Sequence, residues 1–416
     1  MTRIEAGLLI PGRGEPVPDG VVVLDGTRIG YAGPAVNAPT AEPGDEVVRV
    51  PVVLPGLWDC HTHLVGLRDS IGSEQLVLTP SQVAAARSVK DAEAALQAGF
   101  TSIREVGGYG VYLARVIDEG TVRGPKVYAA GSVLSPSGGH SDVHGLPHSW
   151  VTDPLRPNGM LQVADGVPEC LRAVRLQLRL GAKLIKVCTS GGVISELDHP
   201  QHQQFGDEEL RAMVEEAARA DRVVAAHCHG RAGIKAALRA GCRTIEHGTD
   251  LDEETAAEMR EAGAILVPTR SIYEAILTRK ELVSPAARRK LEEIEARHSE
   301  AMGIAHRMGV RIALGTDLGT SDPESPLAWG RNGREFGYLV AAGLSPLEAI
   351  EAGTATAPET LGPQAPRSGL LAAGHDADVI AVSRNPLDDI GVLAEPDEIT
   401  HVWKSGTPVK VPTAGN

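Results

Sequence analysis

The sequence predicts an α/β protein, a (β/α)8 TIM barrel with a small β-sandwich domain built from both termini. Between about residues 56 and 360, short apolar strands alternate with amphipathic helices, a pattern typical of parallel strands joined by helical crossovers. The segments on either side contain short strands broken by Gly and Pro turns. The predicted domains are therefore residues 1–55 plus 361–416 for the sandwich and 56–360 for the barrel.

The length and composition of the chain suit this arrangement. The chain has 416 residues, enough for a barrel with a smaller second domain, and 42% of them are hydrophobic. Aromatic residues make up only 3%, so Val, Leu, Ile and Ala have to pack the core. This composition favours helices on a parallel sheet over an aromatic-rich sandwich.

The two terminal segments resemble each other in pattern. Val21–Leu24, the turn at Asp25-Gly26 and Arg28–Tyr31 predict a hairpin. Near the other end, Ala377–Val382 and Ile399–Lys404 are strand-like. Two β-rich ends around a different middle indicate one small unit assembled from both termini.

The middle of the chain contains the repeated elements. We expect strands at Val127–Ala130, Leu184–Val187, Val223–Ala226, Thr244–Glu246, Ala264–Val267 and Arg311–Leu314. We expect helices at Ser81–Ala98, Asp207–Ala220, Ala232–Ala240 and Glu253–Ala262. Several helices should end at a glycine, where a left-handed residue closes the last turn: Gly99, Gly181, Gly241 and Gly263.

Charge and cysteine content narrow the class of protein. A formal net charge of −14 argues against nucleic-acid or anionic-membrane partners. The stretch from Arg279 to Lys290 is mixed in sign and predicts a solvated helix face. Five cysteines without paired spacing indicate reduced thiols. Without a signal-peptide pattern or an apolar run of roughly 20 residues, we expect a cytoplasmic protein.

A histidine pair follows the first predicted strand. This strand runs from Val52 to Cys60 and ends at His61-Thr62-His63. Because side chains alternate along a strand, His61 and His63 should both point into the barrel mouth, with Cys60 and Thr62 pointing away. A lone histidine is usually a core or surface residue, but two on one face at a strand end suit zinc or a similar cation.

Lys186 is the candidate for an inward-pointing lysine. Lys183 and Lys186 are three residues apart in an expected strand, so only one of them can enter the barrel, and Lys186 lies deeper in the apolar run. A charged lysine beside cations would be repelled and costly to desolvate. Reaction with carbon dioxide would make it an anionic carbamate able to bridge two metals. The alternative is a lysine that reaches the rim.

Later strand ends carry further candidates, namely His227, His229, His247 and Asp317. His227 and His229 form a second same-face pair. We expect His247 to share its face with Ile245, which turns Glu246 outward. Asp317 is a carboxylate suited to bind a metal and to accept a proton from a bridging water.

The order of these motifs resembles the amidohydrolase superfamily across nearly the whole chain. It is most similar to the imidazolonepropionase-like and Xaa-Pro dipeptidase (carboxypeptidase) branch, which has a binuclear metal centre. The matching segments are Pro55–His63, Ile185–Val187 with Gly191-Gly192, His227–Gly230, Glu246–Gly248 and Gly315–Asp317. The resemblance implies that His61 and His63 bind one metal, that a carboxylated Lys186 bridges both, that His227 and His247 hold the second, and that Asp317 contacts the first and acts as the catalytic base.

The resemblance also includes one loop, and the chain differs from several members of the branch at one position. Ser135–Asp142 resembles a family loop in which a histidine approaches the substrate carbonyl. This implies that His140 is a catalytic and substrate-binding residue that stabilises an oxyanion; the alternative is a solvent-exposed loop histidine. Several dipeptidases of this branch have a substrate-holding tyrosine where this chain has His229. The resemblance therefore implies a substrate-binding role for His229 without implying proline specificity.

Together these features predict a metal-dependent hydrolase. We expect it to cleave an amide bond in a peptide-like substrate, an N-acyl amino acid or a dipeptide, by a metal-bridged hydroxide. Its cofactors would be two divalent metal ions, zinc by default, and carbon dioxide as the lysine carbamate. The expected partner is a small-molecule substrate. The oligomeric state stays open, with a homo-oligomer among the expected states.

Three alternatives remain at this stage. The same centre could hydrolyse a cyclic amide, a lactone or another ester. A mononuclear deaminase shares most ligands, but it normally lacks the lysine and has a glutamate where this chain has Gly230–Gly233. A non-catalytic metal-binding protein is the third. The loops at 189–205, 270–276 and 318–326 should determine the substrate, with Arg270 and Tyr273 as candidate contacts or surface residues.

Overall fold

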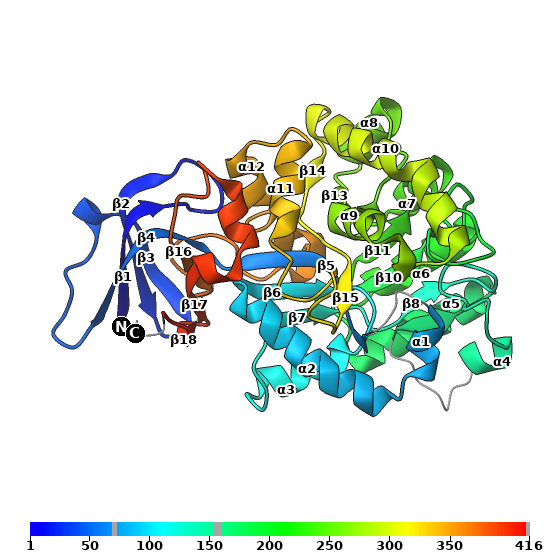
Figure 1. The fold of residues 1–416 in the computed structure, drawn as a ribbon, viewed down its shortest axis with the longest axis horizontal. Coiled ribbons are helices and arrows are strands. Elements are labelled where there is room, and N and C mark those ends of the chain that lie inside the picture. Colours follow the sequence, from blue (N-terminus) through cyan, green and yellow to red (C-terminus); the bar gives the residue numbers. More distant parts are fainter. Residues whose placement is uncertain (69–72, 153–159, 413–416) are drawn as a thin grey trace.

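A seven-stranded sheet at one end of the molecule takes strands from both ends of the chain (Figure 1). The computed structural model describes residues 1–68, 73–152 and 160–412. The strands of this terminal sheet, in spatial order, are β18 (Thr407–Lys410), β17 (Ile399–Lys404), β16 (Val379–Val382), β4 (Glu46–Pro55), β1 (Thr2–Leu9), β2 (Val17–Asp25) and β3 (Arg28–Pro34). β2 and β3 form the expected hairpin. The sheet buries its own apolar cluster, which includes Ile4, Val22 and Trp403.

The predicted strand from Val52 to Cys60 is in fact two strands in different sheets. β4 ends at Pro55 in the terminal sheet, and β5 (Leu57–Leu67) starts after Gly56. Gly56 N donates to Asp378 O at 2.9 Å, and a side chain at Gly56 would overlap Thr101. The prediction of one continuous strand failed because the apolar run continues through the point where the chain changes sheets.

Two parallel sheets contain the remaining strands. One has the order β15 (Leu318–Thr320), β5, β6 (Phe100–Glu105) and β7 (Lys126–Ala129). The other has the order β14 (Arg311–Ile312), β13 (Ile265–Val267), β12 (Thr244–His247), β11 (Val224–Cys228), β10 (Ile185–Cys188), β8 (Val133–Ser135) and β9 (Leu161–Val163). Backbone hydrogen bonds link the two sheets in two places, from Lys183 N to Ala129 O and from Cys60 N to Leu314 O, each at 2.8 Å.

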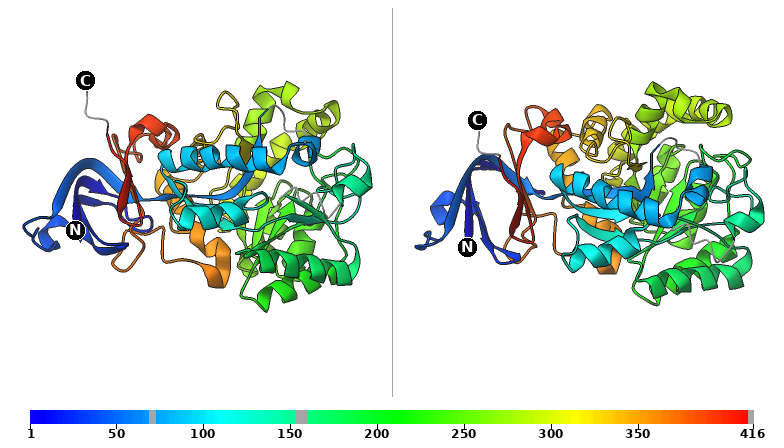
Figure 2. Two further views of the ribbon diagram at one scale, coloured as in Figure 1. Left: turned by 90° about the horizontal axis from the view of Figure 1, so that it is seen from below. Right: turned by 60° about the horizontal axis from the view of Figure 1, so that its bottom comes forward.

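Helices flank the parallel sheets, and Figure 2 shows them around the strands with the terminal sheet set to one side. The longer ones are α2 (Ser81–Gln97), α3 (Gly110–Asp118), α5 (Gly166–Leu180), α6 (Asp207–Ala218), α7 (Arg231–Ala240), α8 (Glu253–Glu261), α9 (Arg270–Thr278), α10 (Pro285–Arg307), α11 (Arg334–Ala341) and α12 (Pro346–Ala352). Shorter helices are α1 (Ser73–Leu78), α4 (His148–Val151), η1 (Ala35–Asn37), η2 (Lys280–Leu282), η3 (Ala357–Gln364), η4 (Ile390–Ala394) and η5 (Pro396–Glu398). Gly181 and Gly241 end α5 and α7 with φ of 97° and 89°, as expected.

The parallel strands bury apolar residues on both faces. Val187 packs in the cluster shared with the helices, whereas Leu184 packs with Cys60 in a second cluster between the two sheets. The prediction that Cys60 points away from this interior is therefore wrong. The register of β5 against β6 shifts in the stretch that holds Cys60 and His61, so simple alternation does not continue through it.

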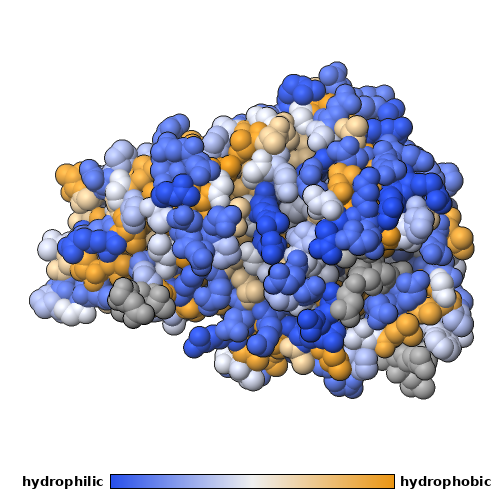
Figure 3. Space-filling view, in the orientation of Figure 1, coloured by the Kyte–Doolittle hydropathy of each residue, from blue (hydrophilic) through white to orange (hydrophobic). Residues whose placement is uncertain are grey.

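The helices, the surface and the cysteines relate to the expectations that were drawn from composition and charge. No helix within residues 1–68, 73–152 and 160–412 is long and apolar enough to cross a membrane. The face in Figure 3 is mostly hydrophilic, with hydrophobic residues in separate patches. All five cysteines are buried and unpaired, in agreement with the expected reduced thiols.

Candidate active site

One pocket lies at the carboxyl ends of the parallel strands. The predicted site residues that line it are His61, His63, His140, Lys186, His227, His229, His247 and Asp317. They come from β5, β10, β11 and β12, from the position just after β11, from the loop after β8 and from the turn before β15. The structure therefore brings together all eight of these predicted metal-binding, catalytic and substrate-binding residues.

The first group of polar atoms surrounds Asp317. Its Oδ1 lies 3.6 Å from His61 Nε2 and 3.1 Å from His63 Nε2. His61, His247 and Asp317 offer ligand atoms within 4.8 Å of one another. Burial raises the pKa of Asp317, but His61 and His63 outweigh it and hold that pKa below its usual value. Asp317 has φ of 63°, a backbone conformation that non-glycine residues tend to adopt at functional sites.

A second group consists of three imidazoles. His227, His229 and His247 offer ligand atoms within 4.8 Å of one another. Burial lowers the pKa of His227 and of His247 well below the ordinary value, and lowers that of His229 to about 3. The rings are therefore neutral near neutral pH and retain the lone pairs that metal binding needs.

The second nitrogen of several rings is held by the protein. Nδ1 of His63 donates to Gly107 O at 2.8 Å, and Nδ1 of His247 lies 2.7 Å from Thr269 Oγ1. Such contacts at Nδ1 leave Nε2 directed at the pocket, as in histidines that bind metals.

Lys186 is buried inside this group, with 2% of its surface exposed. Its Nζ has no hydrogen-bond partner among the described residues, and burial lowers its pKa below the ordinary value. Lys183 is exposed instead, so the choice between the two lysines is correct and the rim alternative is wrong. An isolated amine at this depth is costly unless it acquires a partner.

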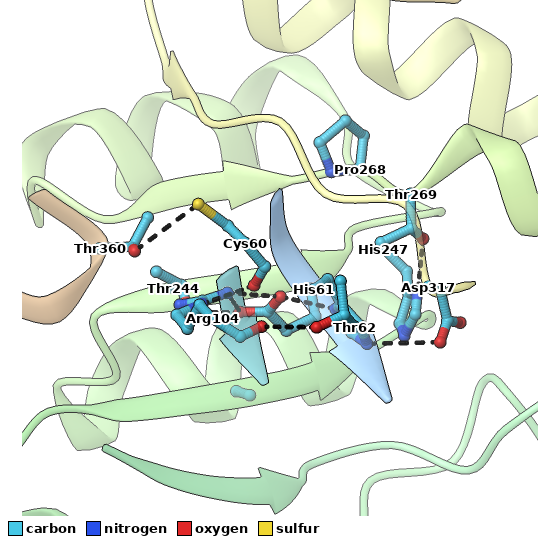
Figure 4. A network of polar contacts seen from close by, with 12 residues as sticks. Cys60, His61, Thr62, Arg104, Thr244, His247, Pro268, Thr269, Asp317 and Thr360 are labelled. Carbon is cyan, nitrogen blue, oxygen red and sulfur yellow. Dashed lines mark hydrogen bonds and ion pairs between the residues drawn. The ribbon is translucent and has the colours of Figure 1, made fainter. Parts of the chain in front are cut away.

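Glu246 differs from its prediction. Its side chain does not point outward: Oε2 lies 2.7 Å from His61 Nδ1, and both carboxylate oxygens accept from Arg104 Nη2 at 2.6 and 2.8 Å. Figure 4 shows Arg104 beside His61. The prediction that His247 shares its face with Ile245 is also wrong. Ile245 packs with the helices, and the backbone φ of 68° at His247 breaks the regular alternation of the strand. Arg104 was missed; the signal in the sequence was a cation next to Glu105 at the end of the short strand Phe100–Glu105.

His140 is a partly buried pocket residue, so the alternative of a solvent-exposed loop histidine is wrong. Its ring stacks on that of His227, with 4.3 Å between centroids and 19° between planes. Its Nδ1 lies 3.0 Å from Ser195 Oγ, a contact with a distant loop that the sequence did not suggest. A side chain at Gly192 would overlap the His140 ring.

Of the two candidate substrate contacts on α9, Tyr273 and Arg270, one lines the pocket and the other does not. Tyr273 is 2% exposed, lines the pocket, and has its hydroxyl 3.1 Å from His229 Nδ1. Arg270 does not line the pocket and forms ion pairs of 2.7 Å with Glu274 and Glu295. Of these two residues, only Tyr273 can therefore face a substrate.

Most of the remaining pocket wall is apolar. Its hydrophobic residues are Val65, Leu67, Leu76, Val133, Met160, Leu161, Val193, Ile194, Ile272, Ile276, Leu291 and Leu327. An apolar wall around a few convergent polar groups is typical of small-molecule sites.

Neutral imidazoles, a carboxylate and a buried lysine at the ends of parallel strands are typical of metal-dependent hydrolases. The amidohydrolase family profile matches residues 52–409. Ochratoxinase from Aspergillus niger is 44% identical over 430 residues, which cover 100% of this chain and 88% of that protein. The chain belongs to the amidohydrolase family.

Solved structures agree with this assignment. The crystal structure of A. niger ochratoxinase superposes with a TM-score of 0.92 over 100% of this chain and 96% of the other. A Xaa-Pro dipeptidase with bound methionine gives a TM-score of 0.86 at 30% identity, covering 98% and 99%. A prolidase complexed with N-methylphosphonate-L-proline gives 0.88 at 32% identity, covering 99% of each chain. The predicted activity, hydrolysis of a C–N bond in an amide, is thereby confirmed.

Proposed function

We propose that this enzyme hydrolyses an amide bond of a small apolar peptide-like substrate, an N-acyl amino acid or a dipeptide, at a centre of two divalent cations, zinc by default. The observation that carries the proposal is the unpartnered Nζ of Lys186, buried among the histidines and Asp317. The ligands would be His61, His63, Lys186, His227, His247 and Asp317.

The residues present fit two cations. The two groups of candidate ligands share His247, so they lie side by side. Nε2 of His227, like Nζ of Lys186, lacks a hydrogen-bond partner among the described residues. Buried polar atoms are rarely left without a partner. Two such atoms in one pocket support a group that they bind.

Carboxylation of Lys186 would match the lysine to this role. Burial favours the neutral amine, and the neutral amine is the form that attacks carbon dioxide. A bond forms between Nζ and the carbon of carbon dioxide, the nitrogen loses one proton, and a carbamate anion with two oxygens results. The released proton passes to water, and the carbamate would be an anionic ligand for the cations.

When bound, the two cations supply a hydroxide nucleophile near neutral pH and polarise the scissile carbonyl. Asp317 would accept the proton of the attacking water on a carboxylate oxygen and deliver it to the leaving nitrogen. His140 would lie against the substrate carbonyl from the other side and stabilise the negative charge that develops on its oxygen. His229 would contact the substrate beside Tyr273.

We propose the finer features of the fold as well. The two backbone hydrogen bonds that link the parallel sheets support one (β/α)8 barrel. The change of sheet at Gly56 supports domains of residues 1–55 plus 361–416 and 56–360, with the terminal sheet forming the β-sandwich.

The proposal is tested with zinc-loaded protein and a panel of N-acyl amino acids and dipeptides with apolar side chains. Ochratoxin belongs in the panel because a relative is named for it. We expect release of the amine product, about two metals per chain by elemental analysis, and loss of activity after chelation that added zinc restores. Full activity of metal-free protein would overturn the proposal. Exclusive turnover of esters, or ammonia release alone, would assign the site to one of the alternatives.

A further inference from the structure

The ring of His140 is held by a loop that follows it by more than fifty residues in the chain. Ser195 Oγ lies 3.0 Å from His140 Nδ1 and also donates to Asp198 Oδ1. The other Asp198 oxygen accepts from Gly192 N at 2.8 Å and from Gln204 Nε2 at 3.1 Å. The Gln204 side-chain oxygen accepts from His140 N at 3.1 Å. Both the ring and the backbone of His140 are therefore connected to Asp198.

The chemistry of these groups fixes the direction of each hydrogen bond. Burial raises the pKa of Asp198, but the nearby His140 and the hydrogen bond from Ser195 outweigh it and hold that pKa below its usual value. An ionised carboxylate only accepts, so the one hydrogen of the Ser195 hydroxyl goes to Asp198. Ser195 Oγ must then accept from His140 Nδ1. The ring therefore carries a proton on Nδ1, and Nε2 is the nitrogen left for the substrate. Nε2 stabilises an oxyanion in the form of the ring that carries a proton on Nε2 as well.

Lys290 anchors the loop from α10. Its Nζ donates to Ser195 O at 2.7 Å and to Gly192 O at 3.1 Å, and lies 3.4 Å from Asp198 Oδ1. The side chains of Lys290 and Asp198 are only 11% and 4% exposed. The prediction of a solvated face over Arg279–Lys290 is therefore wrong for Lys290. A cation withdrawn from water in this way needs a full set of partners, and this loop supplies them.

We propose that Ser195 and Asp198, anchored by Lys290, are positioning residues that keep a proton on Nδ1 of His140 and fix the direction of its ring. The inference rests on the proposed contact of His140 with the scissile carbonyl. One face of the ring lies on His227, and Nδ1 is tied to Ser195. With its tilt and its rotation both restricted, the ring presents Nε2 to the pocket without a reorganisation step.

The first experiment is a double-mutant cycle on the zinc-loaded enzyme. We expect Ser195→Ala and Asp198→Asn each to lower kcat/KM about tenfold or more, with metal content unchanged, and Ser195→Thr to retain most of the activity because it keeps the hydroxyl. In a His140→Ala background, Ser195→Ala should have no further effect. Glu196→Gln, an exposed acid on the same loop, is the control. An equal loss from Ser195→Ala with or without His140 would overturn the proposal.

The second experiment does not depend on turnover. Long-range 1H–15N spectra of histidine-labelled protein distinguish protonated from unprotonated ring nitrogens, and the His140→Ala variant assigns the signals of His140. We expect protonated Nδ1 in the wild type and in Glu196→Gln, and a changed pattern in Ser195→Ala and Asp198→Asn. A wild-type His140 ring with unprotonated Nδ1 would overturn the proposed positioning by Ser195 and Asp198. If the wild type hydrolyses no amide but the spectra match, the proposed function fails while the positioning of His140 stands.

Discussion

Glu246 Oε2 lies 2.7 Å from Nδ1 of His61, and the residue after Glu246 is His247, whose ring centroid lies 4.9 Å from that of His61. Strand β12 therefore supplies one imidazole to the site and the carboxylate that orients another. Burial raises the pKa of Glu246, but Arg104 and His61 outweigh it and hold that pKa far below its usual range. Arg104, itself fully buried, keeps this carboxylate charged and lies beside His61 (Figure 4).

Glu246→Gln should weaken metal binding. Glutamine can still accept from His61, but it lacks the negative charge that makes the imidazole a better ligand, and it leaves Arg104 buried without a counter-charge. We expect metal affinity about 10- to 100-fold lower, measured by competition with a chromogenic chelator. The exposed Glu261→Gln on α8 is the control. Unchanged metal affinity in Glu246→Gln would show that Glu246 serves only the packing of Arg104.

Lys186→Ala should abolish turnover and reduce the metal content. The substitution removes the only lysine that lines the described pocket and with it the proposed bridge between the two cations. Lys183→Ala, three residues earlier and exposed, should behave as the wild type. Reconstitution of wild-type apoprotein should also speed up with added bicarbonate, whereas Lys186→Ala should not respond. A fully active Lys186→Ala enzyme in metal-free buffer would contradict the proposed centre.

Leu76→Asp should impair binding of apolar substrates more than it impairs chemistry. Leu76 lies on α1 in the apolar part of the pocket wall and is only half-buried, so a charge there should be tolerated by the fold. We expect KM for an apolar N-acyl amino acid to rise about tenfold, with kcat and metal content nearly unchanged. The adjacent, exposed Gln75 gives the matched control Gln75→Asp. A fall in kcat alone would place the substrate away from α1.

The sequence could predict the site where chemistry and strand position coincide. His61, His63, Lys186, His227 and Asp317 were found because polar side chains at the ends of apolar strands converge in a parallel α/β arrangement. The pocket contains all of them. For these residues, residue type and position at a strand end were enough to predict a place in the pocket.

The predictions of side-chain orientation were wrong where the backbone departs from regular strand geometry. Cys60 and Glu246 both face the interior, contrary to the alternation rule. A register shift in β5 and a positive φ at His247 are the causes, and neither leaves a mark in residue type. The contact between Lys290 and Asp198 joins segments 92 residues apart, so no local pattern could have indicated it.

Asp91, which does not line the pocket, gives a pH-dependent test of the fold. It lies on α2, where it is 5% exposed, and it accepts a hydrogen bond from Ser321 Oγ at 2.5 Å. Burial raises the pKa of Asp91 from 3.8 to about 7. Between these values the folded chain binds a proton that the unfolded chain has released. The contribution of Asp91 to the free energy of unfolding therefore falls as pH rises through this window, on the order of a few kcal/mol in total.

Asp91→Asn should remove this dependence, because the amide stays neutral at every pH and can still accept from Ser321. Relative to the wild type, we expect the variant to gain stability at about pH 8 compared with about pH 5, measured by urea unfolding at constant metal concentration. Asp118→Asn, an exposed acid at the end of α3, should show the same difference from wild type at both pH values. If Asp91→Asn instead lost stability as pH rose, Asp91 would be ionised in the folded protein, and its hydrogen bond with Ser321 would outweigh its burial.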